Sequence, residues 1–93
     1  MTKEHWAALV EASGAKKDGE GFLLPPEGKL LTLYVSSNGA TLSVQRIEAV
    51  REEAGLVRAR TKKGELFVLA LQDLFAGAVE ETQGGSARKA GFV

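Results

Sequence analysis

The 93-residue chain carries 12 basic and 12 acidic side chains, so its formal net charge is zero, and 44% of its residues are hydrophobic. Such a composition is typical of one globular domain and excludes a largely disordered chain. The charge balance disfavours a protein that depends mainly on phosphate contacts, and the absence of cysteine excludes disulfides, thiolate metal sites and thiol nucleophiles.

The first segment has the pattern of a helix over residues 2–13. Thr2 can cap its N-terminus and Gly14 can end it. Larger side chains recur there with helical spacing, at Trp6, Leu9, Val10 and Ser13. The segment lacks the apolar core of a signal peptide, and no stretch approaches the roughly 20 apolar residues of a membrane span. We therefore expect a cytoplasmic protein with no membrane partner.

Residues 15–21 are rich in glycine and charge, which predicts a turn-rich link. After it, Phe22 to Leu24 can form an edge strand at most, because Pro25 and Pro26 lack backbone donors and restrict the residue that precedes them.

Asn38-Gly39 lies between two strand-like runs, which is the strongest short-range signal for a two-residue type I′ hairpin. Closing the turn with Ser37 opposite Ala40 makes one face apolar and the other mostly polar. The predicted cross-strand pairs are Ser36 with Thr41, Val35 with Leu42, Tyr34 with Ser43 and Leu33 with Val44. The apolar alternation then changes phase before Ile47, so we expect a β-bulge near Gln45 and Arg46 that bends the strand.

Two further turns, at Glu53 to Gly55 and at Lys62 to Gly64, have the pattern of three-residue loops that end in a left-handed glycine. The resulting registers place Glu48 opposite Arg60 and Val50 opposite Arg58. They predict a core face made of Ile47, Ala49, Val57, Ala59, Phe67 and Leu69.

Near the C-terminus, Asp73 can cap a single 3₁₀ turn through Leu74 and Phe75, and Ala78 to Glu81 can form a last strand. We expect one domain over residues 1–83, followed by a glycine-rich flexible tail at residues 84–93.

The predicted fold is mainly β: an N-terminal helix and a five-stranded antiparallel, partly closed small barrel. Its order of elements over residues 2–81 resembles the layout of SH3-like and Sm-like domains. No motif specific to either group is present, and such a fold serves many unrelated functions.

Catalytic side chains are scarce in this chain. It has one histidine, His5, and two aspartates, Asp18 and Asp73, which are far apart in sequence. General acid-base catalysis and metal binding require several such groups to converge. We therefore expect no enzymatic activity, no cofactor and no metal site.

Basic side chains gather around one predicted strand. Arg58, Arg60 and Lys62 alternate along it, and Arg46 and Lys63 are close enough in the fold to join them as a nucleic-acid-binding face. The predicted pairing of Arg60 with Glu48 reduces the positive potential there, so we treat nucleic-acid binding as the alternative function.

The strand from Glu65 to Leu71 is apolar on both faces, and such a strand is normally covered on both. The helix can cover Leu66 and Val68, or another protein or a second copy of the chain can do so. The predicted function is a non-catalytic interaction or assembly module. Its predicted partner-binding residues are Arg58, Arg60, Leu66, Val68 and Trp6.

Overall fold

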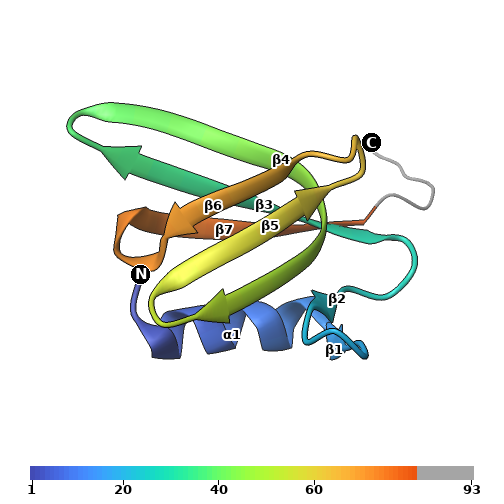
Figure 1. The fold of residues 1–93 in the computed structure, drawn as a ribbon. Helices are drawn as coiled ribbons and strands as arrows, with labels where there is room; N and C mark the ends of the chain where they lie inside the picture. Colours follow the sequence, from blue (N-terminus) through green and yellow to red (C-terminus); the bar gives the residue numbers. More distant parts are fainter. Residues whose placement is uncertain (82–93) are drawn as a thin grey trace, which may run out of the picture.

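The computed structural model describes residues 1–81 and shows one N-terminal helix below a curled antiparallel sheet (Figure 1). The sheet bends through roughly half of a barrel, and the helix lies across its lower side in this view. The prediction of a small, mainly β fold with an N-terminal helix is confirmed. The predicted tail, residues 84–93, lies outside the described residues.

Helix α1 spans Lys3–Ser13 and begins and ends as its sequence predicts. The Thr2 side chain accepts a hydrogen bond from the His5 backbone N–H, which satisfies one of the free donors at the helix start. Gly14 adopts a left-handed φ of 73°, and its N–H donates to the Glu11 carbonyl. Both contacts are local, which is why a one-dimensional pattern suffices to locate this helix.

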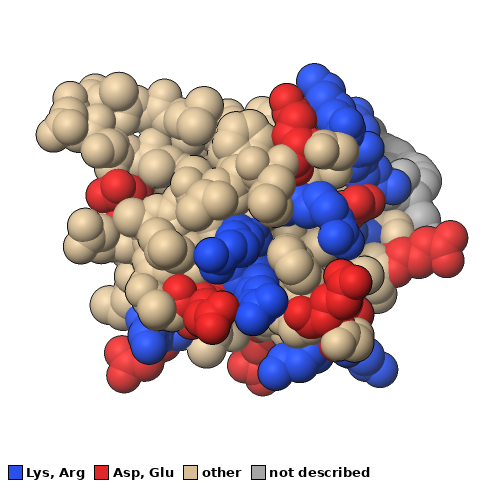
Figure 2. Space-filling model, in the orientation of Figure 1, with Lys and Arg blue, Asp and Glu red and all other residues tan. Residues whose placement is uncertain are grey.

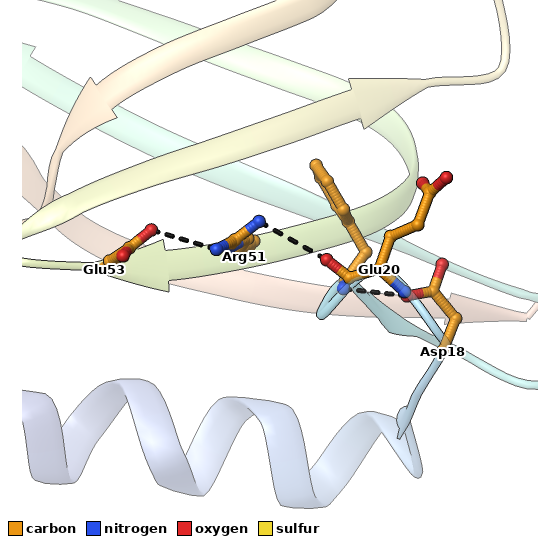
Figure 3. Close-up of polar contacts among 5 residues, drawn as sticks. Asp18, Glu20, Arg51 and Glu53 are labelled. Atoms are coloured by element: carbon orange, nitrogen blue, oxygen red, sulfur yellow. Dashed lines mark hydrogen bonds and ion pairs between the residues drawn. The ribbon is translucent and has the colours of Figure 1, made fainter.

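A small hairpin follows, with β1 at Lys16–Lys17 and β2 at Leu23–Leu24. A strand was predicted at Phe22 to Leu24, but as an edge strand, whereas β2 lies between β1 and β4. β1 was not predicted within the turn-rich link, where Lys16 pairs with Leu24. Asp18 stabilises the connection: its Oδ1 accepts hydrogen bonds from the N–H groups of Glu20 and Phe22 (Figure 3).

β3, Lys29–Ser37, and β4, Ala40–Glu53, form the long projecting hairpin of Figure 1. Asn38 and Gly39 have φ of 52° and 82°, as a type I′ turn requires. The predicted register is confirmed at every pair from the turn to Leu33 opposite Val44. The predicted bulge is confirmed as well, with Arg46 at a φ of 58°.

The turn between β4 and β5, Leu56–Thr61, differs from its prediction. Glu53 pairs with Leu56, so the loop has two residues and not three. The register near the turn is therefore displaced by one residue: Val50 lies opposite Ala59, and Ala49 lies opposite Arg60. A bulge at Glu48 absorbs the displacement, and Ile47 pairs with Thr61 beyond it. The observed register buries Val50 completely.

The turn between β5 and β6, Leu66–Ala70, matches its prediction. Gly64 has a φ of 90°, and the Thr61 N–H donates to the Glu65 carbonyl across the three-residue loop. Ala59 therefore lies opposite Phe67, and Val57 opposite Leu69.

A 3₁₀ turn at Leu71–Asp73, η1, leads into β7, Leu74–Glu81. The predicted turn lay two to three residues later, and Asp73 makes no capping hydrogen bond, so that prediction is wrong. The last strand is twice as long as the predicted Ala78 to Glu81, because it pairs with β3 along its length.

Within the described residues the long strands are ordered β7-β3-β4-β5-β6, with β2 added at the far end of β4. The concave inner face of this sheet holds the core, and Trp6 of α1 packs into it. Of the predicted core residues, four are buried and Phe67 and Leu69 are half-buried against that core. The fully buried ones are Ile47, Ala49, Val57 and Ala59.

Candidate interaction surfaces

The convex side of the β5–β6 hairpin carries exposed apolar side chains next to arginines. Alternation sends Val57 and Ala59 into the core, so Leu56, Arg58 and Arg60 point outward. The cross-strand pairs place Leu66 beside Arg60 and Val68 beside Arg58. Leu66 and Val68 are each 55% exposed, and Leu56 is 41% exposed. We call Leu56, Arg58, Leu66 and Val68 the β5–β6 outer surface.

The backbone of β6 adds hydrogen-bonding groups to this surface. Glu65, Phe67, Leu69 and Leu71 are the residues whose backbone groups face β5, as the bonds from Thr61 N–H to Glu65 and from Leu71 N–H to Gly55 show. The backbone groups of Leu66 and Val68 therefore point away from β5. Among the described strands, β6 pairs with β5 alone, so these groups form an open edge.

The helix does not cover this surface, which excludes the first of the two alternatives for Leu66 and Val68. Trp6 is only 6% exposed and lies in the core, together with half-buried Leu9 and Val10. The helix packs against β7 and β3 and places Leu9 against Gly77. Trp6, predicted to bind a partner, is thus separated from the other four predicted partner-binding residues.

Arg60 is already engaged within the chain. Its Nε lies 3.4 Å from Glu48 Oε2, and its guanidinium carbon lies 5.3 Å from the centre of the Phe22 ring. Both contacts involve the guanidinium group, and the aliphatic part of the side chain borders the outer surface. Arg58 makes no ion pair within residues 1–81.

The five predicted nucleic-acid-binding residues are distributed over three places. Arg58 lies on the outer surface, while Arg60 and Lys62 line a shallow hollow beside Leu24 and Leu30. Arg46 and Lys63 line a different hollow at the edge of β4. In Figure 2, blue side chains lie over β5 and near the β5–β6 turn with red ones between them, whereas the area over β6 and the projecting hairpin is tan.

That second hollow has a volume of about 270 Å³ and was not predicted from the sequence. Val44 and Phe67 contribute apolar atoms to its lining, and Arg46, Lys63 and Glu65 contribute charged ones. Leu42, 50% exposed, follows along the same face of β4. The hollow exists because β4 is 14 residues long in the structure and β5 only six, so part of β4 lacks a neighbour on one side.

A second polar cluster anchors the β1–β2 hairpin on β4. Arg51 lies 3.1 Å from Glu53 Oε1 and donates to the Glu20 carbonyl at 3.3 Å (Figure 3). Gly21 approaches the same guanidinium with a φ of 89°. These groups satisfy one another, so the cluster explains how the hairpin is held.

The candidate catalytic residues do not converge. Asp18 is occupied by the backbone of its own turn, and His5 lies exposed on the first turn of α1. Within residues 1–81, no group of three or more His, Asp or Glu side chains is arranged to hold a metal ion. The same residues include no helix of the length and apolarity needed to cross a membrane.

Comparisons with known proteins found no match among family models, curated proteins or solved structures.

Proposed function

We propose that this domain is a non-catalytic interaction module that binds another protein, or a second copy of itself, through the β5–β6 outer surface. The observation that carries this proposal is the exposure of Leu66 and Val68 at 55% each, side by side on one open strand. Exposed apolar patches next to an unpaired strand edge are common sites of protein association.

The chemistry of the surface supports a protein partner over a nucleic acid. Arginine beside aliphatic side chains is enriched at protein interfaces, and Arg58 lies opposite Val68. The backbone donors and acceptors of Leu66 and Val68 can pair with an added strand, which is a recurrent mode of protein recognition. Arg60, in contrast, is partly neutralised by Glu48.

The finer fold assignment belongs to the same proposal. A meander of β3 to β6 with a 3₁₀ turn before a last strand that returns to β3 supports the likeness to SH3-like and Sm-like domains. In folds of this kind the function is set by the surface and not by the topology.

The proposal is tested by the solution mass of the full chain and by partner capture. We expect either a concentration-dependent dimer or larger assembly in sedimentation velocity, or a partner captured from the native lysate. Val68→Glu, which places a charge among the apolar groups, should abolish either one. The matched control Phe75→Glu alters an apolar side chain of similar exposure, 53%, on β7 and should change neither.

A monomeric chain that captures no partner would refute the proposed function. It would also be refuted if Val68→Glu assembled and captured partners like the unmodified chain and like Phe75→Glu, while circular dichroism showed all three folded.

A further inference from the structure

The edge of β4 that continues the β3–β4 hairpin is open over several residues. β5 begins to pair with β4 only at Ile47, and among the described strands nothing pairs with β4 on that side between Ala40 and Arg46. The Lys62 N–H donates to the Arg46 carbonyl at 3.0 Å, so the open part starts directly beyond this contact. It runs outward along the projecting hairpin in Figure 1.

The turn geometry determines which backbone groups are unused there. The type I′ turn makes Ser37 and Ala40 a hydrogen-bonded pair, and alternation then directs the backbone groups of Leu42 and Val44 to β3. The N–H and C=O groups of Thr41 and Ser43 consequently point away from β3, toward the open side. An extended segment laid along this edge would gain up to four main-chain hydrogen bonds from them.

The side chains beside this edge indicate which side chains a bound segment would need. Leu42 and Val44 lie on the inner face with Phe67 of β6, so every second side chain of the segment would meet an apolar surface. At the end nearest the β5–β6 turn, Arg46 and Lys63 line the hollow, and neither forms an ion pair within residues 1–81. Glu65, the one acidic group in the lining, lies 3.4 Å from the Thr61 hydroxyl.

We propose that the open β4 edge and its hollow bind an extended peptide segment that runs antiparallel to β4. The segment carries an acidic side chain at the end beside Arg46 and Lys63. Its alternating apolar side chains lie over Leu42 and Phe67. Charge complementarity selects this occupant, because the hollow presents two cations without acidic partners among the described residues. Antiparallel pairing places the N-terminal end of the segment at the cations, because β4 runs from Thr41 toward Arg46.

The probe is a pool of acetylated, fluorescently labelled seven-residue peptides with Glu at the first position and Val, Leu or Ile at alternate positions. We expect saturable binding to the full chain in fluorescence anisotropy. A pool with Lys in place of Glu should bind at least tenfold more weakly, since one charged hydrogen bond contributes about 1.5–3 kcal/mol. Methylation of the peptide nitrogens should abolish binding, because it removes the main-chain donors.

Two variants test the protein side of the contact. Arg46→Asn removes the charge but keeps a residue that tolerates the left-handed backbone, whose φ is 58°. Combined with Lys63→Gln, it should reduce affinity for the Glu pool roughly tenfold or more and leave the Lys pool unaffected. Binding should also shift the amide resonances of Thr41 and Ser43 in a two-dimensional NMR spectrum.

Val68→Glu is the matched control, because it alters the β5–β6 outer surface and should leave peptide binding unchanged. If the unmodified chain binds no peptide, the result counts against this site alone. If the unmodified chain neither assembles nor captures a partner, the result counts against the proposed function alone. No binding of the Glu pool overturns the inference, as does binding that ignores the Arg46 and Lys63 changes. It is equally overturned if a mixed single-stranded oligonucleotide binds with the same residue dependence and the peptides do not, since the hollow would then recognise phosphate.

Discussion

Arg60 and Glu48 form an ion pair at 3.4 Å although the register places Arg60 opposite Ala49. Glu48 occupies the bulge that lies between the pairs of Ile47 and Ala49, so its side chain is re-aimed toward the arginine on the neighbouring strand, β5. Arg60 uses its other side to cover Phe22, which ties the β1–β2 connection to β5. The bulge thus joins three segments of the chain that are distant in sequence.

We predict that this ion pair contributes little and the Phe22 contact more. Both partners are well exposed, so Glu48→Gln should lower the free energy of unfolding by about 0.2–1 kcal/mol, and added salt should reduce the difference. Arg60→Ala should lower the free energy of unfolding by more than Glu48→Gln does, because it also removes packing on Phe22. Urea unfolding at two salt concentrations measures both effects. Equal costs for the two variants would contradict the assigned role of Phe22.

The two type I′ turns predict opposite responses to one exchange of residues. Ala54 adopts a φ of 55°, where its Cβ is strained, whereas Asn38 occupies the equivalent place in the other turn with a φ of 52°. Ala54→Asn should therefore raise the free energy of unfolding by about 0.5–1 kcal/mol, and Asn38→Ala should lower it by a similar amount. Thermal unfolding of both variants checks the sign, and a destabilised Ala54→Asn would contradict a strained left-handed backbone at Ala54.

Thr32 and Thr61 are both buried but differ in hydrogen bonding. The Thr32 hydroxyl has no partner within the described structure, while the Thr61 hydroxyl accepts the Glu65 N–H at 3.2 Å. Thr32→Val should raise the free energy of unfolding by about 1 kcal/mol, because a buried unpaired hydroxyl is removed. Thr61→Val should lower it by about 1 kcal/mol, since it leaves a donor unpaired. Chemical unfolding of the pair provides the measurement, and a destabilised Thr32→Val would indicate a partner for that hydroxyl.

Gly77 allows α1 to approach β7 closely. A Cβ added at Gly77 would overlap Leu9 Cδ2, so Gly77→Ala should lower the free energy of unfolding by about 1–3 kcal/mol. When Leu9 is already changed to Ala, Gly77→Ala should lower the free energy of unfolding by less. A double-mutant cycle measures this interaction energy between the two positions. Gly19→Ala is the control, because no atom lies within 4 Å of its added Cβ. Strictly additive effects of the two substitutions would argue against the helix packing described above.

Several elements could be predicted from the sequence because they depend on local interactions. The cap at Thr2, the left-handed stop at Gly14 and the Asn38-Gly39 turn each depend on contacts within a few residues. A two-residue turn also determines the register of both its strands, and the phase change before Ile47 required a bulge. These features are confirmed because a single arrangement satisfies both the backbone and the apolar pattern.

Other elements depended on distant partners. The Glu53 to Gly55 turn was predicted wrongly because the burial of Val50 against the core outweighs the local strain of Ala54. β7 begins at Leu74 because β3 offers a full-length partner, and no short window of sequence contains that information. The same holds for the candidate sites: alternation indicated that Leu66 and Val68 share a face, but not whether the helix covers it.

The amino-acid sequence by itself determined the class of fold, the helix and the β3–β4 register. It also determined which side chains of β5 and β6 share the outward face. These features follow from periodicity and turn chemistry. Only the tertiary structure decided where the helix packs and which edges stay open. Those outcomes depend on how a bent β4 distributes its neighbours in space: β3 along one side, and β5 only from Ile47 onward on the other. Exposure is a property of the whole assembly of strands, so the open β4 edge and the uncovered Leu66 and Val68 became visible only there.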